Sequence, residues 1–246
     1  MADPTGAIRR YLYHGTPYAY EGLPDSVNKA KRVGWDGSPA LPRYVSEALG
    51  SHWAADPEIS NGFAKRSSLG WGNPRVFRAK HPGDDAFMEV PNKRDVDTTA
   101  IQNLGYDVAF RRNPDLALPL LRSTMEGPNP IRYDQSLESV IDMMNRGEPV
   151  SASRIWSGGD PVQRLPRSTT WGSLFRRTTP AQYSPEVASS VADELRKELI
   201  ERNLMGLRYR NTIEGKGLPD RTSYIVLDSN ALEFAKGGYL RRGCHG

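Results

Sequence analysis

The stretch GLRYRNTIEGKGLPDRTSYIVLD, residues 206–228, decides the fold of this chain. Its two ends, 207–209 and 224–227, are rich in aromatic and β-branched residues, a pattern that predicts two short β-strands. The connection between them holds residues that break regular structure, namely Gly215, Gly217, Pro219 and Asp220. Glu214 is therefore expected near the end of the first strand, where a rigid sheet can aim its carboxylate at a ligand. An isolated loop glutamate can equally be a solvated side chain.

A second stretch far upstream favours the ligand-binding interpretation of Glu214. Residues 11–16 read YLYHGT, a short aromatic strand that ends in His14, Gly15 and Thr16. A polar ring followed by glycine allows a ligand to approach the bare backbone closely. These three residues are therefore candidates for ligand binding.

A third motif lies in residues 49–64. Residues 49–54, LGSHWA, predict a strand, and the Asp-Pro-Glu that follows predicts the start of a helix, with Asp56 as its N-cap. Neighbouring residues of a strand point to opposite faces of a sheet. We therefore assign His52 to a ligand pocket and Trp53 to the core, with a packed or surface histidine as the alternative for His52.

Together, these motifs resemble the ADP-ribosyltransferases. YHGT near the start, G-x-H-W-A-x-D-P in the middle and Y-x-N-x-x-E-G followed by S-Y near the end resemble the histidine-type branch, which includes the poly(ADP-ribose) polymerases, the diphtheria-like toxins and many phage-encoded or bacterial members. The resemblance implies an α+β fold in which two small, mostly antiparallel sheets face each other across an NAD+ cleft, with peripheral helices.

The resemblance also implies a function. The chain would be a mono-ADP-ribosyltransferase that uses NAD+ as co-substrate, releases nicotinamide and modifies a macromolecular acceptor, either a protein or a nucleic acid. Glu214 matches the catalytic glutamate, which stabilises the oxocarbenium-like transition state. The NAD+-binding positions would be His14, Gly15, Thr16, His52, Tyr209 and Asn211. Many members carry a tyrosine that stacks on nicotinamide where His52 stands here, which leaves that role open.

Two other functions stay open. A relative that removes an RNA 2′-phosphate with NAD+ is suggested by a histidine in the second motif, although Glu214 argues against it. A catalytically silent binding or virion-associated domain of the same fold is the other. Thr212 stands where an acid two residues before the catalytic glutamate would favour arginine acceptors, so acids, hydroxyls or a nucleic-acid base remain candidate acceptors.

The chain length of 246 residues fits one domain, 1–246, with an insertion at about 93–184. Within the insertion, residues 106–110 alternate as a strand does, and 147–184 lack periodicity. An amphipathic helix should run from Pro185 to about Asn203. The insertion also holds aromatic and basic residues that are candidates for an acceptor platform: Trp156, Arg164, Arg167, Trp171, Phe175 and Arg176.

Composition excludes several classes of protein. The net charge is +4, from 33 basic and 29 acidic residues, which is too balanced to indicate a nucleic-acid partner by itself. One cysteine cannot form an intrachain disulfide, and the four histidines lack metal-ligand spacing, so we expect no metal. No apolar run is long enough to span a membrane and no signal peptide is evident, so we expect no membrane partner and a cytoplasmic protein of the producing or target cell.

Overall fold

The computed structural model describes residues 11–16, 44–67, 75–91, 97–126, 131–133, 135–148, 150, 152–154, 163–164, 171, 185–213 and 215–239. The chain forms two compact units. The first, called the sheet unit here, takes in Met1–Pro39, Gly50–Asp97 and Leu199–Gly246. The second, the helical unit, takes in Ala40–Leu49 and Thr98–Glu198, a range that overlaps the insertion expected at about 93–184.

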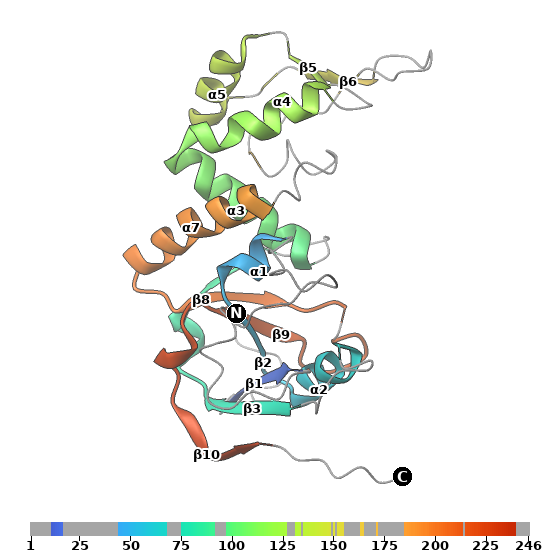
Figure 1. Cartoon of the computed structure of the whole chain (residues 1–246), viewed down its shortest axis with the longest axis vertical. Helices are drawn as coiled ribbons and strands as arrows, with labels where there is room; N and C mark the ends of the chain where they lie inside the picture. The colour runs from blue at the N-terminus through green and yellow to red at the C-terminus, as the bar shows by residue number, and fades with distance from the viewer. Residues whose placement is uncertain are drawn as a thin grey trace. The chain divides into compact units, whose positions relative to one another are not determined.

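The sheet unit is built on one seven-stranded sheet with the order β10-β3-β1-β2-β9-β8-β4 (Figure 1). Its strands are β1 (Tyr11–Thr16), β2 (Ser51–Ala54), β3 (Arg75–Lys80), β4 (Phe87–Glu89), β8 (Gly206–Arg210), β9 (Thr222–Val226) and β10 (Phe234–Tyr239). Every neighbouring pair is antiparallel except β4 and β8, which are parallel. The two strands predicted within 206–228 are β8 and β9. The protein is therefore of the mixed α+β class, with a mostly antiparallel sheet.

The sheet has a weak line between β1 and β2, which we call the seam. β1 pairs with β3 at every position from Tyr11↔Lys80 to Thr16↔Arg75, and β8 pairs with β9 along its whole length. In contrast, β1 meets β2 at the single register pair Tyr13↔Ala54. We expected two small sheets facing each other across a cleft. The described strands of this unit instead form one sheet, in which two well-paired parts meet at the seam.

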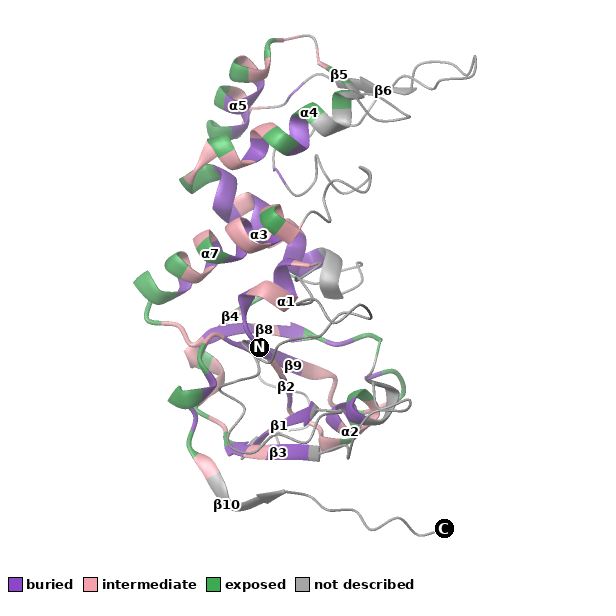
Figure 2. Cartoon of the chain, in the orientation of Figure 1, coloured by how far each residue is buried: buried purple, intermediate pink, exposed green. Residues whose placement is uncertain are grey.

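One face of this sheet carries the hydrophobic core of the unit. Side chains directly opposite each other in an antiparallel pair share a face, and the residues of this face form one buried cluster: Leu12, Trp53, Phe77, Ala79, Phe87, Tyr224, Val226 and Leu232. We call it the core face. Figure 2 shows the corresponding strands as largely buried. Trp53 is 1% exposed, which confirms its predicted place in the core.

The opposite face of β1 is covered by α2 (Pro57–Ser67). The helix begins as the sequence predicts, because Asp56 accepts a hydrogen bond from the backbone N–H of Glu58 at 2.8 Å and proline occupies the first turn. The Ser60 hydroxyl donates to the carbonyl of Tyr13 at 2.8 Å, which fixes α2 to β1.

The parallel edge strand β4 is fastened by polar contacts. Arg208 of β8 pairs with Asp84 at 2.9 Å and with Glu89 at 2.7 Å. The Tyr224 hydroxyl donates to the other oxygen of Asp84 at 2.8 Å. Asp84 belongs to the 3-10 helix η2 (Asp84–Ala86), which leads directly into β4. These contacts compensate for the short length of the edge strand, whose backbone pairing is limited to three positions.

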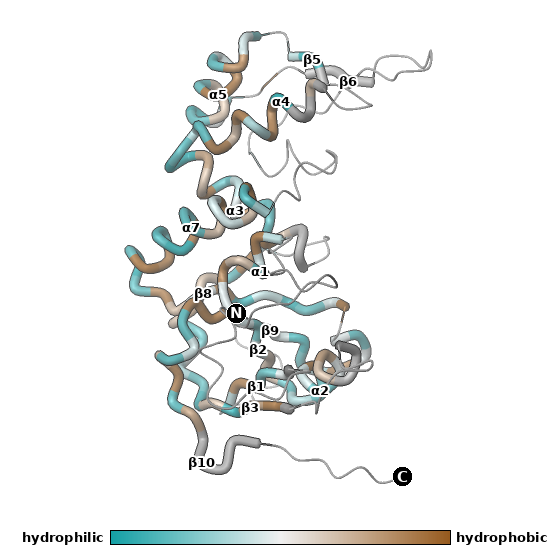
Figure 3. Tube along the Cα trace, viewed as in Figure 1, coloured by the Kyte–Doolittle hydropathy of each residue, from teal (hydrophilic) through white to brown (hydrophobic). Residues whose placement is uncertain are grey.

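The helical unit contains most of the helices in the described part of the chain. They are α1 (Val45–Leu49), α3 (Asp97–Arg112), α4 (Leu118–Glu126), α5 (Leu137–Asn145) and α7 (Pro185–Glu201), with the 3-10 helix η3 (Pro114–Ala117) and a small antiparallel sheet of β5 (Ile131–Tyr133), β6 (Ala152–Arg154) and β7 (Gln163–Arg164). The helix expected from Pro185 is confirmed, and its apolar stripe appears in Figure 3 as alternating hydrophobic and hydrophilic segments. Ala188, Val191, Ala192 and Leu195 of this stripe are buried.

The strand expected at 106–110 is wrong. These residues belong to α3, where Tyr106 and Phe110 stack with ring centroids 5.1 Å apart. Residues four apart lie on the same side of a helix, so the pair that seemed to alternate is a helical contact. Trp171 packs edge-on against Phe110 at 5.2 Å and is 1% exposed. Trp171 is therefore a core residue and is not available to the acceptor platform.

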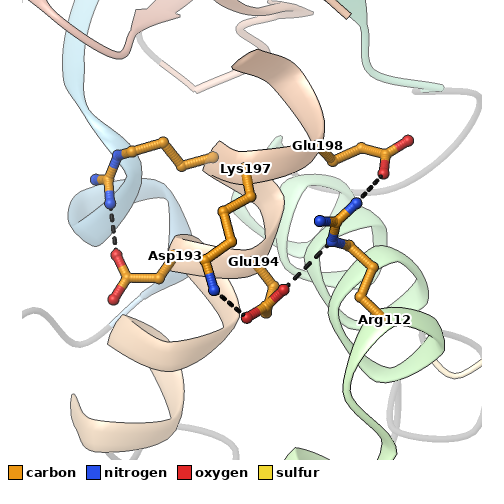
Figure 4. A network of polar contacts seen from close by, with 6 residues as sticks. Arg112, Asp193, Glu194, Lys197 and Glu198 are labelled. Atoms are coloured by element: carbon orange, nitrogen blue, oxygen red, sulfur yellow. Dashed lines mark hydrogen bonds and ion pairs between the residues drawn. The ribbon is translucent and has the colours of Figure 1, made fainter. Parts of the chain in front are cut away.

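Ion pairs connect α3 to α7 on the surface of the helical unit (Figure 4). Arg112 contacts Glu198 at 2.9 Å and Glu194 at 3.3 Å, and Lys197 approaches Glu194 at 2.6 Å. The pKa of Glu194 lies below its usual value, first because of the Lys197 hydrogen bond and then because of Arg112. Arg196 also donates to the carbonyl oxygens of Ala48 and Leu49, which caps the end of α1. Among the described helices, none is long and apolar enough to cross a membrane.

Candidate functional site

His14 lies on the core face of β1 and is 4% exposed. Its Nδ1 atom lies 2.6 Å from the backbone carbonyl oxygen of His52. A carbonyl can only accept, so Nδ1 carries the hydrogen and Nε2 keeps a lone pair. Burial lowers the pKa of His14 from 6.5 to about 4, against the opposing effect of the bond to His52. The ring is therefore neutral at pH 7.

The ring of His14 lies among aromatic side chains. Its centroid is 5.2 Å from the Trp53 ring and 6.2 Å from the Phe77 ring. Its Nε2 atom is buried and has no hydrogen-bond partner among the described residues. A buried acceptor without a partner is rare in proteins and calls for an explanation. Here the buried atom keeps a lone pair that no described donor uses.

Gly15 makes a close backbone contact that the sequence does not indicate. A Cβ atom at this position would lie 1.9 Å from the carbonyl oxygen of Ser60 in α2. The close approach at Gly15 is therefore made by the backbone of α2, on the face opposite His14, whereas we expected a ligand there. The backbone of Thr16 pairs with Arg75 in β3, and the side chain of Thr16 lies outside the described part of the structure.

His52 and Tyr209 come together on the same face of the sheet. The Nδ1 atom of His52 lies 3.0 Å from the Tyr209 hydroxyl, and the two rings meet edge to face at 6.2 Å. They reach each other across β9, where His52 is opposite Ile225 and Tyr209 is opposite Ser223. This face is opposite to the one that carries the His14 side chain, so the two histidine rings lie on opposite faces of the sheet.

Asn211 closes the turn that follows β8. Its backbone N–H donates to the carbonyl of Arg221 at 2.6 Å, and its side-chain oxygen accepts from the backbone N–H of Ile213 at 3.1 Å. A Cβ atom at Gly215 would lie 2.5 Å from the carbonyl oxygen of Asn211, so the turn needs glycine there. Glu214 itself lies outside the described residues. Asn211 therefore has an observed structural role, because its contacts hold Ile213, Gly215 and Arg221 after β8.

Beside His14 lies a buried chain of hydrogen bonds between two serines and a tryptophan, which no sequence pattern indicates. The Trp53 Nε1–H donates to the Ser51 hydroxyl at 2.8 Å, and Ser51 shares a hydrogen bond of 2.6 Å with the Ser229 hydroxyl. All three side chains are at most 2% exposed. Serine in a strand or loop is normally a surface residue, so only the fold could reveal this chain of contacts.

The described residues contain no group of three or more His, Cys, Asp or Glu side chains that could hold a metal ion. A comparison with protein-family models, curated proteins and solved structures finds no match to this chain.

Proposed function

We propose that this protein is a mono-ADP-ribosyltransferase that cleaves NAD+ and transfers ADP-ribose to a macromolecular acceptor. The observation that supports it best is the sheet order. The three motifs lie far apart in the sequence, yet their strands β1, β2 and β8 belong to one run of neighbours in which only β9 intervenes. Residues that must act on one ligand are thereby brought to one region of the sheet.

The proposed chemistry needs a carboxylate and a set of positioned hydrogen bonds. The bond between the ribose C1′ and the nicotinamide nitrogen breaks, and nicotinamide leaves with the electron pair. Positive charge then develops on the ribose, and Glu214 is proposed to stabilise it. An acceptor oxygen or nitrogen attacks C1′ and loses its proton to solvent or to a nearby base. Nicotinamide leaves as a neutral molecule, so the reaction needs no metal ion.

The state of His14 supports a donor-bearing ligand over a phosphate. Because Nδ1 donates to the His52 carbonyl, the Nε2 atom of His14 bears a lone pair and can only accept a hydrogen bond from a ligand. A ribose hydroxyl can donate to that lone pair, whereas the anionic oxygens of an RNA 2′-phosphate would be repelled. His14 thus fits a ribose hydroxyl of NAD+, whereas Glu214 is the residue that argues against the 2′-phosphate enzyme.

The decisive experiment measures nicotinamide. Purified protein is incubated with NAD+ labelled in the adenine ring, with and without a cell lysate as the source of acceptors. We expect free nicotinamide by chromatography and labelled macromolecules that mass spectrometry can identify. If nicotinamide is not released with any acceptor mixture and calorimetry detects no NAD+ binding, the proposal fails. A catalytically silent domain of this fold would then be the better hypothesis.

A further inference from the structure

The position of the His14 ring depends on contacts with His52 and Trp53 of the middle motif, which only the fold brings beside it. The ring is held by the His52 carbonyl at 2.6 Å. The ring also packs against Trp53, whose indole centroid is 5.2 Å away and whose plane is tilted by 43°. A ring held by one hydrogen bond can still swing about its side-chain bonds, so the tryptophan that packs against it limits its orientation.

The indole of Trp53 is in turn held in place by hydrogen bonds. Its Nε1–H donates to Ser51, two residues earlier on the same strand, and Ser51 bonds to Ser229 in the 3-10 helix η5 (Ser229–Ala231). The Ser51 hydroxyl also lies 3.4 Å from the Val226 carbonyl. These contacts are buried, where a hydrogen bond is costly to leave unmade. The indole therefore has one favoured position.

We propose that Ser229, Ser51 and Trp53 are positioning residues that hold the His14 ring so that its Nε2 lone pair is aimed at a donor group of the ligand. The group recognised is an uncharged hydroxyl or amide N–H, and an anionic oxygen is rejected. That NAD+ supplies this group rests on the proposed function. That Trp53 orients the His14 ring is independent of the proposed function.

Two features indicate that the arrangement serves more than packing. A phenylalanine at position 53 would fill an apolar core without a donor that needs a partner, whereas the indole requires Ser51. In addition, the chain of contacts ends at a buried Nε2 that lacks a partner among the described residues. A neutral ring placed in a core for packing alone would cost less if both of its nitrogens were bonded.

The proposal can be tested on the full chain by NMR, without any assay of activity. Two-bond correlations between ring protons and nitrogens distinguish a bare from a protonated nitrogen, and His14→Gln identifies the His14 signals. In the wild type we expect Nδ1 protonated and Nε2 bare between pH 8 and pH 5.5. In Ser51→Ala and in Trp53→Phe we expect the ring to swing away from the His52 carbonyl for part of the time, so that both nitrogens move toward the averaged positions of a ring that exchanges tautomers. We also expect the dissociation constant for NAD+ to rise about tenfold.

Tyr224→Phe is the matched control. It removes a hydrogen bond of the same 2.8 Å length from the same core face but leaves the chain from Ser229 to His14 intact. We expect its His14 signals and NAD+ affinity to equal those of the wild type. The proposal is overturned if both test variants keep a single His14 tautomer, or if Tyr224→Phe changes it as much as they do. If the wild type binds no NAD+ but the tautomer depends on Ser51 and Trp53, the proposed function fails and the positioning role stands.

Discussion

The Nδ1 atom of His14 donates to the carbonyl oxygen of His52 at 2.6 Å, and this bond crosses the seam where β1 and β2 share one register pair. The bond joins two of the three motifs that we predicted to act together. It also fixes which nitrogen of His14 bears the hydrogen, and that in turn determines what the buried ring can bind.

Acid should destabilise the protein through His14. The pKa of this residue is 6.5 in an unfolded chain and about 4 in the folded protein, so the unfolded state takes up a proton first as the pH falls. Stability is therefore unaffected by His14 above about pH 6.5 and is lost progressively down to about pH 4, by roughly 3 kcal/mol in total. When urea unfolding is measured at a series of pH values, the free energy of unfolding of His14→Gln should depend less on pH between pH 6.5 and pH 4 than that of the wild type. Equal slopes would show that His14 does not stay neutral.

Gly15 should tolerate no side chain. In Gly15→Ala the new Cβ would meet the Ser60 carbonyl, so α2 or β1 must shift, and we expect a loss of about 1–3 kcal/mol in the free energy of unfolding. Gly62 on α2 is the control, because a Cβ there meets nothing within 4 Å. Gly62→Ala should stabilise the protein by about 0.5–1 kcal/mol through its higher helix propensity. Thermal unfolding of both variants distinguishes a steric clash at Gly15 from a general intolerance of glycine-to-alanine changes, which would lower the unfolding temperature of both.

Local patterns in the sequence were sufficient for the strands β8 and β9, the helix α7 and the N-cap Asp56. Each depends on residues close together in the chain, where periodicity and capping act. The same information placed His52 and Trp53 on opposite faces of one strand. It did not show that His14 shares the face of Trp53, because that depends on the register between β1 and β2, which is set by tertiary packing.

Other failures have the same origin. Gly15 suggested an approaching ligand, yet a helix backbone occupies that space, and no sequence pattern distinguishes these two partners. The aromatic residues of 106–110 fit both a strand and a helix, since five residues are too few to separate the two periods. Trp171 was a candidate for the acceptor platform because it is one of the aromatic residues of the insertion, but its contact with Phe110 comes from a helix far away in the sequence.

Loss of Arg112 should weaken the helical unit. Its side chain is 27% exposed and contacts two carboxylates, Glu194 and Glu198, that are 14% and 19% exposed. In Arg112→Met the apolar part of the side chain is largely kept but both ion pairs disappear. We expect the free energy of unfolding to fall by about 1 kcal/mol. Lys197→Met should cost less, because the Lys197 side chain is 58% exposed. The free energies of unfolding of the two variants, measured by urea unfolding, should differ less in 1 M salt. A difference that persists in 1 M salt would show that packing, not charge, is responsible.

Trp171→Ala should reduce stability and not acceptor choice. Removing a fully buried tryptophan leaves a cavity beside Phe110, which costs about 3–5 kcal/mol. Calorimetry should show a lower unfolding temperature, and any loss of labelling should follow the fraction of unfolded protein. Trp156→Ala is the contrasting variant, because Trp156 remains a candidate for the acceptor platform. Loss of labelling with unchanged stability in Trp171→Ala would contradict its assignment to the core.

Replacing Glu214 by glutamine should abolish turnover while leaving the fold intact. The change keeps the volume of the side chain but removes the charge that is proposed to stabilise the developing oxocarbenium ion, so we expect kcat to fall by two or more orders of magnitude. The affinity for NAD+ should change little, because most of the lost interaction forms only in the transition state.

Glu233→Gln is the control for Glu214→Gln, since Glu233 is an exposed carboxylate in the same unit and pairs with Lys80. Nicotinamide release and calorimetric NAD+ binding are measured on both variants and the wild type. A Glu214→Gln protein that releases nicotinamide at the wild-type rate would rule out Glu214 as the catalytic carboxylate, and equal losses in both variants would point to a general effect of charge on NAD+ binding.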